Sequence, residues 1–174
     1  MLDEQVQKNP AYKSDENYLA ATSKISYAKG DYQTAYVIAD KLIKEIEKAF
    51  APDKPFEIKY KDNHIRDSVQ YAYIIRYQAS AGMRHYADAL SDLDHALKLS
   101  VSPELLRSKT GVLLYLGKYK EAAAVSDEAY GLNQNIFVSS HYRSYYCGLF
   151  KEHNYAVKDC DELNKKMAAE KTTK

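Results

Sequence analysis

A tyrosine is followed three residues later by alanine at Tyr32, Tyr86 and Tyr119, and the same surrounding apolar pattern recurs at all three places. Stepping 3, 4, 7, 10 and 11 residues from each tyrosine stays on one face of an α-helix. These steps give Tyr32, Ala35, Tyr36, Ala39, Leu42 and Ile43, then Tyr86, Ala89, Leu90, Leu93, Ala96 and Leu97, and finally Tyr119, Ala122, Ala123, Ser126, Ala129 and Tyr130. A mostly apolar face with alanine near its start predicts a helix that packs closely against a neighbour.

A turn precedes each of these faces, with Gly30, Gly82 or Gly117 close to the tyrosine. Glycine after a helical pattern takes the left-handed conformation that ends a helix and lets the chain reverse. Another helical pattern lies upstream of each glycine, so the unit is a helical hairpin. We expect the first hairpin to begin with Ser14 as N-cap, and the third with Ser102 as N-cap before Pro103.

The residues Gly30-Asp31-Tyr32-x-x-Ala35, Tyr86-x-x-Ala89 with Ala96, and Gly117-Lys118-Tyr119-x-x-Ala122 with Ala129 resemble the tetratricopeptide repeat (TPR) family. Its units are helix pairs of about 34 residues. Tyr86 and Tyr119 are 33 residues apart, whereas Tyr32 and Tyr86 are 54 apart, which indicates an insertion. A fourth unit is indicated by Tyr155, 36 residues after Tyr119, although Lys158 occupies its alanine position. It is interpreted as a degenerate terminal repeat.

The expected organisation is one all-α domain with flanking segments. It comprises an N-terminal arm over 1–13, one repeat domain over 14–169 with units at about 14–50, 64–100, 102–132 and 134–169, an insertion at 51–63, and a disordered tail over 170–174.

The resemblance implies a right-handed solenoid whose first helices line a concave groove that binds a peptide or helix of a partner protein. We expect the groove residues on the first helices, on the side away from the Tyr-x-x-Ala faces. The candidates are Asn17, Lys24, Tyr27, Tyr73, Arg76, Tyr77, Arg107, Tyr115, His141, Tyr142 and Tyr145. Tyrosine and arginine are enriched at binding hot spots. The alternative at each tyrosine is a core position with its hydroxyl at the surface.

The aromatic composition is unusual, with 17 tyrosines, 4 phenylalanines and no tryptophan. Six tyrosines are explained by the repeat itself, because they close turns or lie on packing faces; they are Tyr32, Tyr36, Tyr86, Tyr119, Tyr130 and Tyr155. Most of the others fall on the expected first helices, so surplus tyrosine is predicted to line the binding side.

The insertion alternates apolar and polar residues at Phe56, Ile58 and Tyr60, which favours an extended segment. One interpretation is an arm that lies across the groove or is offered to a partner. The other, which we favour, is a loop that covers the apolar end of the preceding helix.

Composition and motifs exclude several classes of function. With 25 basic and 24 acidic residues the net charge is +1, which argues against a nucleic-acid partner. No apolar run is long enough to insert into a membrane. No catalytic motif is present, and neither a cofactor nor a metal is expected. Asp88, Asp92 and His95 share a helix face, which we interpret as charged, solvated surface rather than a metal site.

Two cysteines, Cys147 and Cys160, are too few for a disulfide framework. A disulfide between them is plausible in an exported protein, whereas in the cytosol they would remain thiols. The sequence carries no export signal; a cytoplasmic location is favoured, and export remains open if a signal peptide has been removed.

Two functions remain. The leading one is a non-catalytic protein-protein interaction module. The alternative is a dedicated small chaperone or immunity protein of a bacterial secreted effector or toxin, as some compact members of this family are. The oligomeric state is left open.

Overall fold

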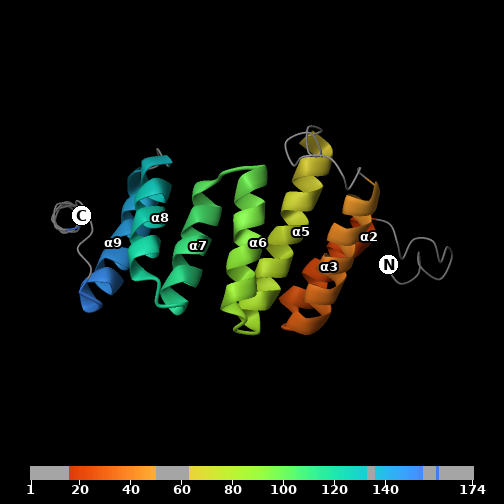
Figure 1. The fold of residues 1–174 in the computed structure, drawn as a ribbon, viewed down its shortest axis with the longest axis horizontal. Coiled ribbons are helices and arrows are strands. Elements are labelled where there is room, and N and C mark those ends of the chain that lie inside the picture. Colours follow the sequence, from red (N-terminus) through yellow and green to blue (C-terminus); the bar gives the residue numbers. More distant parts are fainter. Residues whose placement is uncertain (1–15, 50–62, 133–135, 155–159, 161–174) are drawn as a thin grey trace. The chain divides into compact units, whose positions relative to one another are not determined.

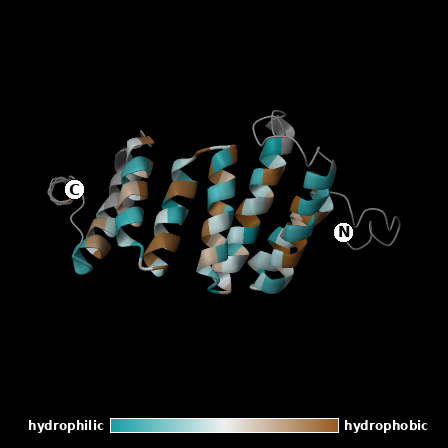
Figure 2. Cartoon of the chain, viewed as in Figure 1, coloured by the Kyte–Doolittle hydropathy of each residue, from teal (hydrophilic) through white to brown (hydrophobic). Residues whose placement is uncertain are grey.

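The computed structural model describes residues 16–49, 63–132, 136–154 and 160. Within these ranges every regular element is an α-helix (Figure 1). The helices are α2 (Glu16–Ala28), α3 (Tyr32–Ala49), α5 (Asn63–Gly82), α6 (Tyr86–Leu99), α7 (Pro103–Tyr115), α8 (Tyr119–Leu132) and α9 (Ile136–Glu152). The predicted all-α fold is confirmed. The helices carry both hydrophilic and hydrophobic residues (Figure 2).

The chain divides into two compact units, residues 1–100 and 101–174. In the first unit α2 packs on α3, α3 on α5 and α5 on α6, so each helix lies against the next one along the chain. In the second unit α7 packs on α8 and α8 on α9. Two side-chain contacts also hold α9 there: the Tyr146 hydroxyl donates to the carbonyl of Arg107 at 3.1 Å, and His153 stacks on Tyr119.

The alanines of the Tyr-x-x-Ala motifs lie in the core. Ala35, Ala89 and Ala122 are each completely buried. Because alanine has no side chain beyond Cβ, a facing helix can approach closely. In the first hairpin Ser23 of α2 uses this closeness and donates from Oγ to the carbonyl of Ala35 at 2.7 Å. The packing faces predicted from the repeats are therefore confirmed here, although Tyr130, placed on one of them, is 40% exposed.

The turns after α2, α5, α7 and α9 share one backbone conformation. A single residue with positive φ follows each helix and donates its N–H to the carbonyl three residues earlier. The four residues are Gly30 (φ 79°), Arg84 (φ 63°), Gly117 (φ 70°) and Asn154 (φ 59°). The expectation is confirmed for Gly30 and Gly117 but wrong for Gly82, which is the last residue of α5, while Arg84 takes the left-handed position.

The helix α7 begins as expected. Ser102 is its N-cap, with Oγ accepting from the backbone N–H of Leu105 at 3.2 Å, and Pro103 follows at the first helical position. Ser14, the expected N-cap of the first hairpin, lies outside the described residues.

Candidate partner-binding site

Two of the predicted site residues on α2 are open to solvent. Asn17 and Lys24 are exposed, seven residues and so about two helical turns apart. Tyr27, one turn beyond Lys24, is half-buried. This part of α2 therefore presents polar and charged groups, with a tyrosine at its end.

A tyrosine cluster, formed by Tyr27, Tyr32 and Tyr77, joins three helices of the first unit. The ring centroids of Tyr27 and Tyr32 are 5.6 Å apart. The pKa of Tyr27 is raised, first by burial and then by the neighbouring phenols of Tyr32 and Tyr77. The structure thus brings together Tyr27 of α2 and Tyr77 of α5, two predicted site residues that are 50 positions apart in the sequence. All three rings are half-buried, an environment that suits apolar rings with polar tips.

Arg76 does not lie on an open binding surface, contrary to the prediction. Its guanidinium reaches Asp92 of α6 through Nε and Nη2, at 3.1 and 2.7 Å, and Asp40 of α3 through Nη1 at 2.6 Å. Its side chain is only 17% exposed. Burial disfavours the charged guanidinium, but the hydrogen bonds and charge of Asp92 outweigh it, so the pKa of Arg76 is raised. Arg76 is an interhelical clamp of the first unit, because its side chain turns toward the second helices.

Asp92 is likewise not part of a solvated outer face. It is 3% exposed, and burial raises its pKa against the opposing effect of Arg76. Asp40 is more open and also pairs with Lys44; here Lys44 and Arg76 outweigh burial, and the pKa of Asp40 is lowered. The described residues contain no group of three or more metal-ligating side chains.

Tyr73 is a second predicted site residue that belongs to the interior. Its side chain is 6% exposed, its ring stacks on His95 with centroids 5.0 Å apart, and its hydroxyl lies 3.5 Å from Oε1 of Glu47. Burial, followed by the charge of Glu47, raises the pKa of Tyr73 to about 12. The alternative reading of a tyrosine in the core is therefore the right one at this position.

Comparison with known proteins identifies the fold. No protein-family model matches the sequence, and no curated protein matches it. A search of solved structures matches YrrB, a TPR protein with an unusual peptide-binding site, over 97% of this chain and 72% of that chain, with a TM-score of 0.63 and 16% identity. The chain has the TPR fold.

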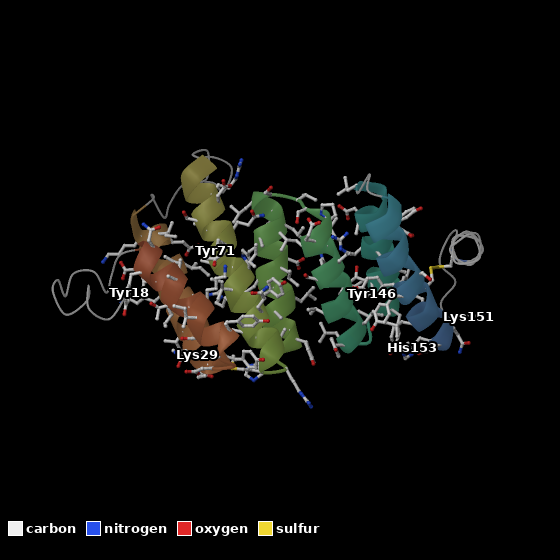
Figure 3. The ribbon with its side chains drawn as sticks, turned by 180° about the vertical axis from the view of Figure 1, so that it is seen from behind. Tyr18, Lys29, Tyr71, Tyr146, Lys151 and His153 are labelled. Atoms are coloured by element: carbon white, nitrogen blue, oxygen red, sulfur yellow. A yellow bond between two sulfur atoms is a disulfide. The ribbon has the colours of Figure 1, made fainter. Side chains whose placement is uncertain are left out.

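In the TPR hairpins of the first unit, counting back from the repeat tyrosine finds equivalent positions. Asn17 lies 15 residues before Tyr32, and Tyr71 lies 15 before Tyr86. In the same way Lys24 is equivalent to Gln78. Tyr71, labelled in Figure 3, and Gln78 are partly exposed on α5, and they replace Tyr73 and Arg76 as candidates there. The spacing to the Tyr-x-x-Ala motif is the sequence signal that could have found them.

The candidates in the second TPR unit are exposed to different degrees. The Arg107 side chain is 13% exposed and pairs with Glu104 at 2.8 Å. Tyr115, the last residue of α7, is 72% exposed, and Tyr145 of α9 is 63% exposed and makes an edge contact with Tyr146. The side chains of His141 and Tyr142 lie outside the described part, as do Phe56, Ile58, Tyr60, Tyr155 and Lys158.

The helices that the structure describes include no candidate for a membrane span, since none combines the necessary length with a sufficiently apolar sequence.

Proposed function

We propose that the protein is a non-catalytic interaction module that holds a peptide segment or helix of another protein against the first helices of its TPR hairpins. The TPR fold supports this proposal, because it presents side chains in repeated rows and needs no reacting group to bind. YrrB, which shares the fold, has a peptide-binding site.

The observation that carries the proposal is the tyrosine cluster beside the exposed part of α2. Half-buried tyrosines offer a large contact area at a small cost in conformational entropy. Tyr27 and Tyr77 come from different first helices, so a ligand that touches both would contact two repeats at once. Lys24 lies one turn from Tyr27 and adds a cation at the edge of this surface.

Site-specific crosslinking tests the proposal. A photoreactive amino acid is placed at Lys24 on α2 in one variant and at Lys41 on α3 in a second, because both positions are exposed lysines on helices of the same hairpin. We expect a partner segment, identified by mass spectrometry, to crosslink from position 24 and not from position 41. Crosslinking from position 41 alone would place the binding surface on the second helices and contradict the proposal.

A further inference from the structure

The four turn residues with positive φ give a common reference position from which the sequences of the hairpins can be aligned. Seven residues before each of them, on the first helix, stand Ser23, Tyr77, Thr110 and Cys147. Ser23 and Thr110 are completely buried and Cys147 is 3% exposed, whereas Tyr77 is only half-buried. Cys147 therefore occupies the position at which two other hairpins bury a small side chain between their helices.

A buried alanine recurs at a matching position of the second helices. Five residues after the left-handed residue the first three hairpins carry Ala35, Ala89 and Ala122, all completely buried. In the fourth hairpin Asp159 stands at this distance from Asn154, and Lys158 stands three residues after Tyr155, so neither count gives an alanine. Burying a charged residue in place of the alanine would be costly.

A covalent bond involves the next residue of the chain, Cys160. Cys147 forms a disulfide with Cys160, six residues after Asn154, and their Cα atoms are 5.6 Å apart (Figure 3). Cys147 lies deep in α9, on the side that also buries Phe150, while Cys160 is partly exposed. The fourth hairpin thus joins its first helix to the following segment by a bond between sulfurs.

We propose that this disulfide is a redox-controlled lock, which fastens Cys160 to α9 in the one hairpin whose sequence lacks the alanine of the other three. In the closing reaction the two thiols give up two electrons and two protons to a disulfide oxidant R–S–S–R, which leaves as two R–SH. In the opening reaction a thiolate attacks the sulfur of Cys160, because that residue is the more exposed; the bond to Cys147 breaks, and Cys147 leaves as a thiolate. A second thiolate then restores Cys160 and releases R–S–S–R.

If the disulfide acts as this lock, the protein works where thiols are oxidised, or it passes between such conditions and reducing ones. It involves no residue of the surface proposed for the partner in the first unit. Its failure and the failure of the proposed function can therefore be told apart.

Hydrogen exchange of the full chain in glutathione buffers tests the lock. Mass spectrometry after alkylation counts the free thiols, and exchange of the peptide over 136–152 reports on α9. With oxidised glutathione we expect no free thiol and a protected α9. With reduced glutathione we expect two free thiols, exchange faster by about tenfold or more, and a melting temperature lower by about 5–10 °C.

Two variants separate the lock from a general effect of the buffer. Cys160→Ser cannot form the bond and should behave like the reduced protein in both buffers. Cys147→Ser with Cys160→Ser places at position 147 the serine that the first hairpin carries, and it should also remain unlocked, because it cannot form the disulfide. Thiols that stay free in oxidised glutathione, exchange that does not change on reduction, or a double variant as protected as the oxidised chain would each overturn the proposal.

Discussion

The ring of Tyr32 lies directly against Gly82, so that a Cβ atom on that glycine would be 2.7 Å from Cδ2 of the ring. Tyr32 begins α3 in the first hairpin, and Gly82 ends α5 in the second. The repeat tyrosine therefore does more than close its own turn, because its ring also packs on the first helix of the next hairpin.

Gly82→Ala tests this contact. Alanine favours a helix over glycine by about 1 kcal/mol, but forcing a methyl group into a filled space costs about 1–3 kcal/mol. We expect the free energy of unfolding to fall by about 1 kcal/mol in urea denaturation. Gly111→Ala in α7 is the matched control, since its Cβ would meet only the Tyr146 hydroxyl, at 3.9 Å. That variant should be stabilised, and a stabilised Gly82→Ala would show that the ring does not occupy this space.

Loss of the Arg76 clamp should reduce the free energy of unfolding by more than the change at Gly82 does. Arg76→Met leaves the buried carboxylate of Asp92 without its partner, and we expect a loss of about 3–5 kcal/mol in the free energy of unfolding. Ile38 of the first hairpin stands at the position equivalent to Asp92, six residues after the repeat tyrosine. Adding Asp92→Ile to Arg76→Met should therefore restore most of the lost free energy of unfolding. Lys118→Met, which removes an exposed ion pair with Glu121, is the control and should cost less than about 1 kcal/mol. Equal losses for Arg76→Met and Lys118→Met would contradict the clamp.

Arg84 holds a conformation that suits glycine. Its φ of 63° matches the left-handed φ values of Gly30 and Gly117, and a left-handed conformation costs a residue with Cβ about 1–2 kcal/mol. Arg84→Gly should therefore raise the free energy of unfolding by about 0.5–1 kcal/mol, after the greater freedom of glycine in the unfolded chain is counted. Gly117→Ala is the reverse experiment and should destabilise. A destabilised Arg84→Gly would show that the arginine side chain contributes more than its backbone strain.

Tyr73 predicts a pH dependence on the alkaline side. Its pKa is raised from 10.0 to about 12 in the folded protein, so folding favours the neutral phenol. The stability that Tyr73 contributes is fully present below pH 10.0, the pKa of its phenol in the unfolded chain, and is lost as the pH rises toward about 12, its pKa in the folded chain. Urea denaturation at about pH 9 and 11 should show a steeper loss for the wild-type chain than for Tyr73→Phe. Parallel losses would mean that the phenol ionises as easily in the folded protein as in the unfolded one.

The repeated hairpins could be predicted because they depend on local regularity. Alanine three residues after a tyrosine, inside an apolar face with helical period, reports directly on a buried helix contact, and Ala35, Ala89 and Ala122 are all buried. Gly30 and Gly117 marked their turns for a similar reason, since glycine is the residue that a left-handed turn favours.

The candidate site was less predictable because it depends on contacts between distant residues. The clamp joins Arg76 to partners 36 and 16 residues away, and no local pattern distinguishes a buried ion pair from a charged surface. The turn before Tyr86 was expected to use Gly82, but Arg84 takes the left-handed conformation, and arginine gives no sequence signal for it. The disulfide was left open, because the spacing of two cysteines does not fix their pairing.

Binding of a partner protein by the first helices of the TPR hairpins can be measured by titration calorimetry of the full chain with the segment identified by crosslinking. Lys24→Glu, Tyr27→Ala and Lys41→Glu are compared with the wild-type chain at equal melting temperature. We expect Lys24→Glu and Tyr27→Ala each to weaken binding by about 1 kcal/mol or more, and Lys41→Glu to leave it unchanged. Unchanged affinity for the first two variants together with a loss for Lys41→Glu would contradict binding at the first helices.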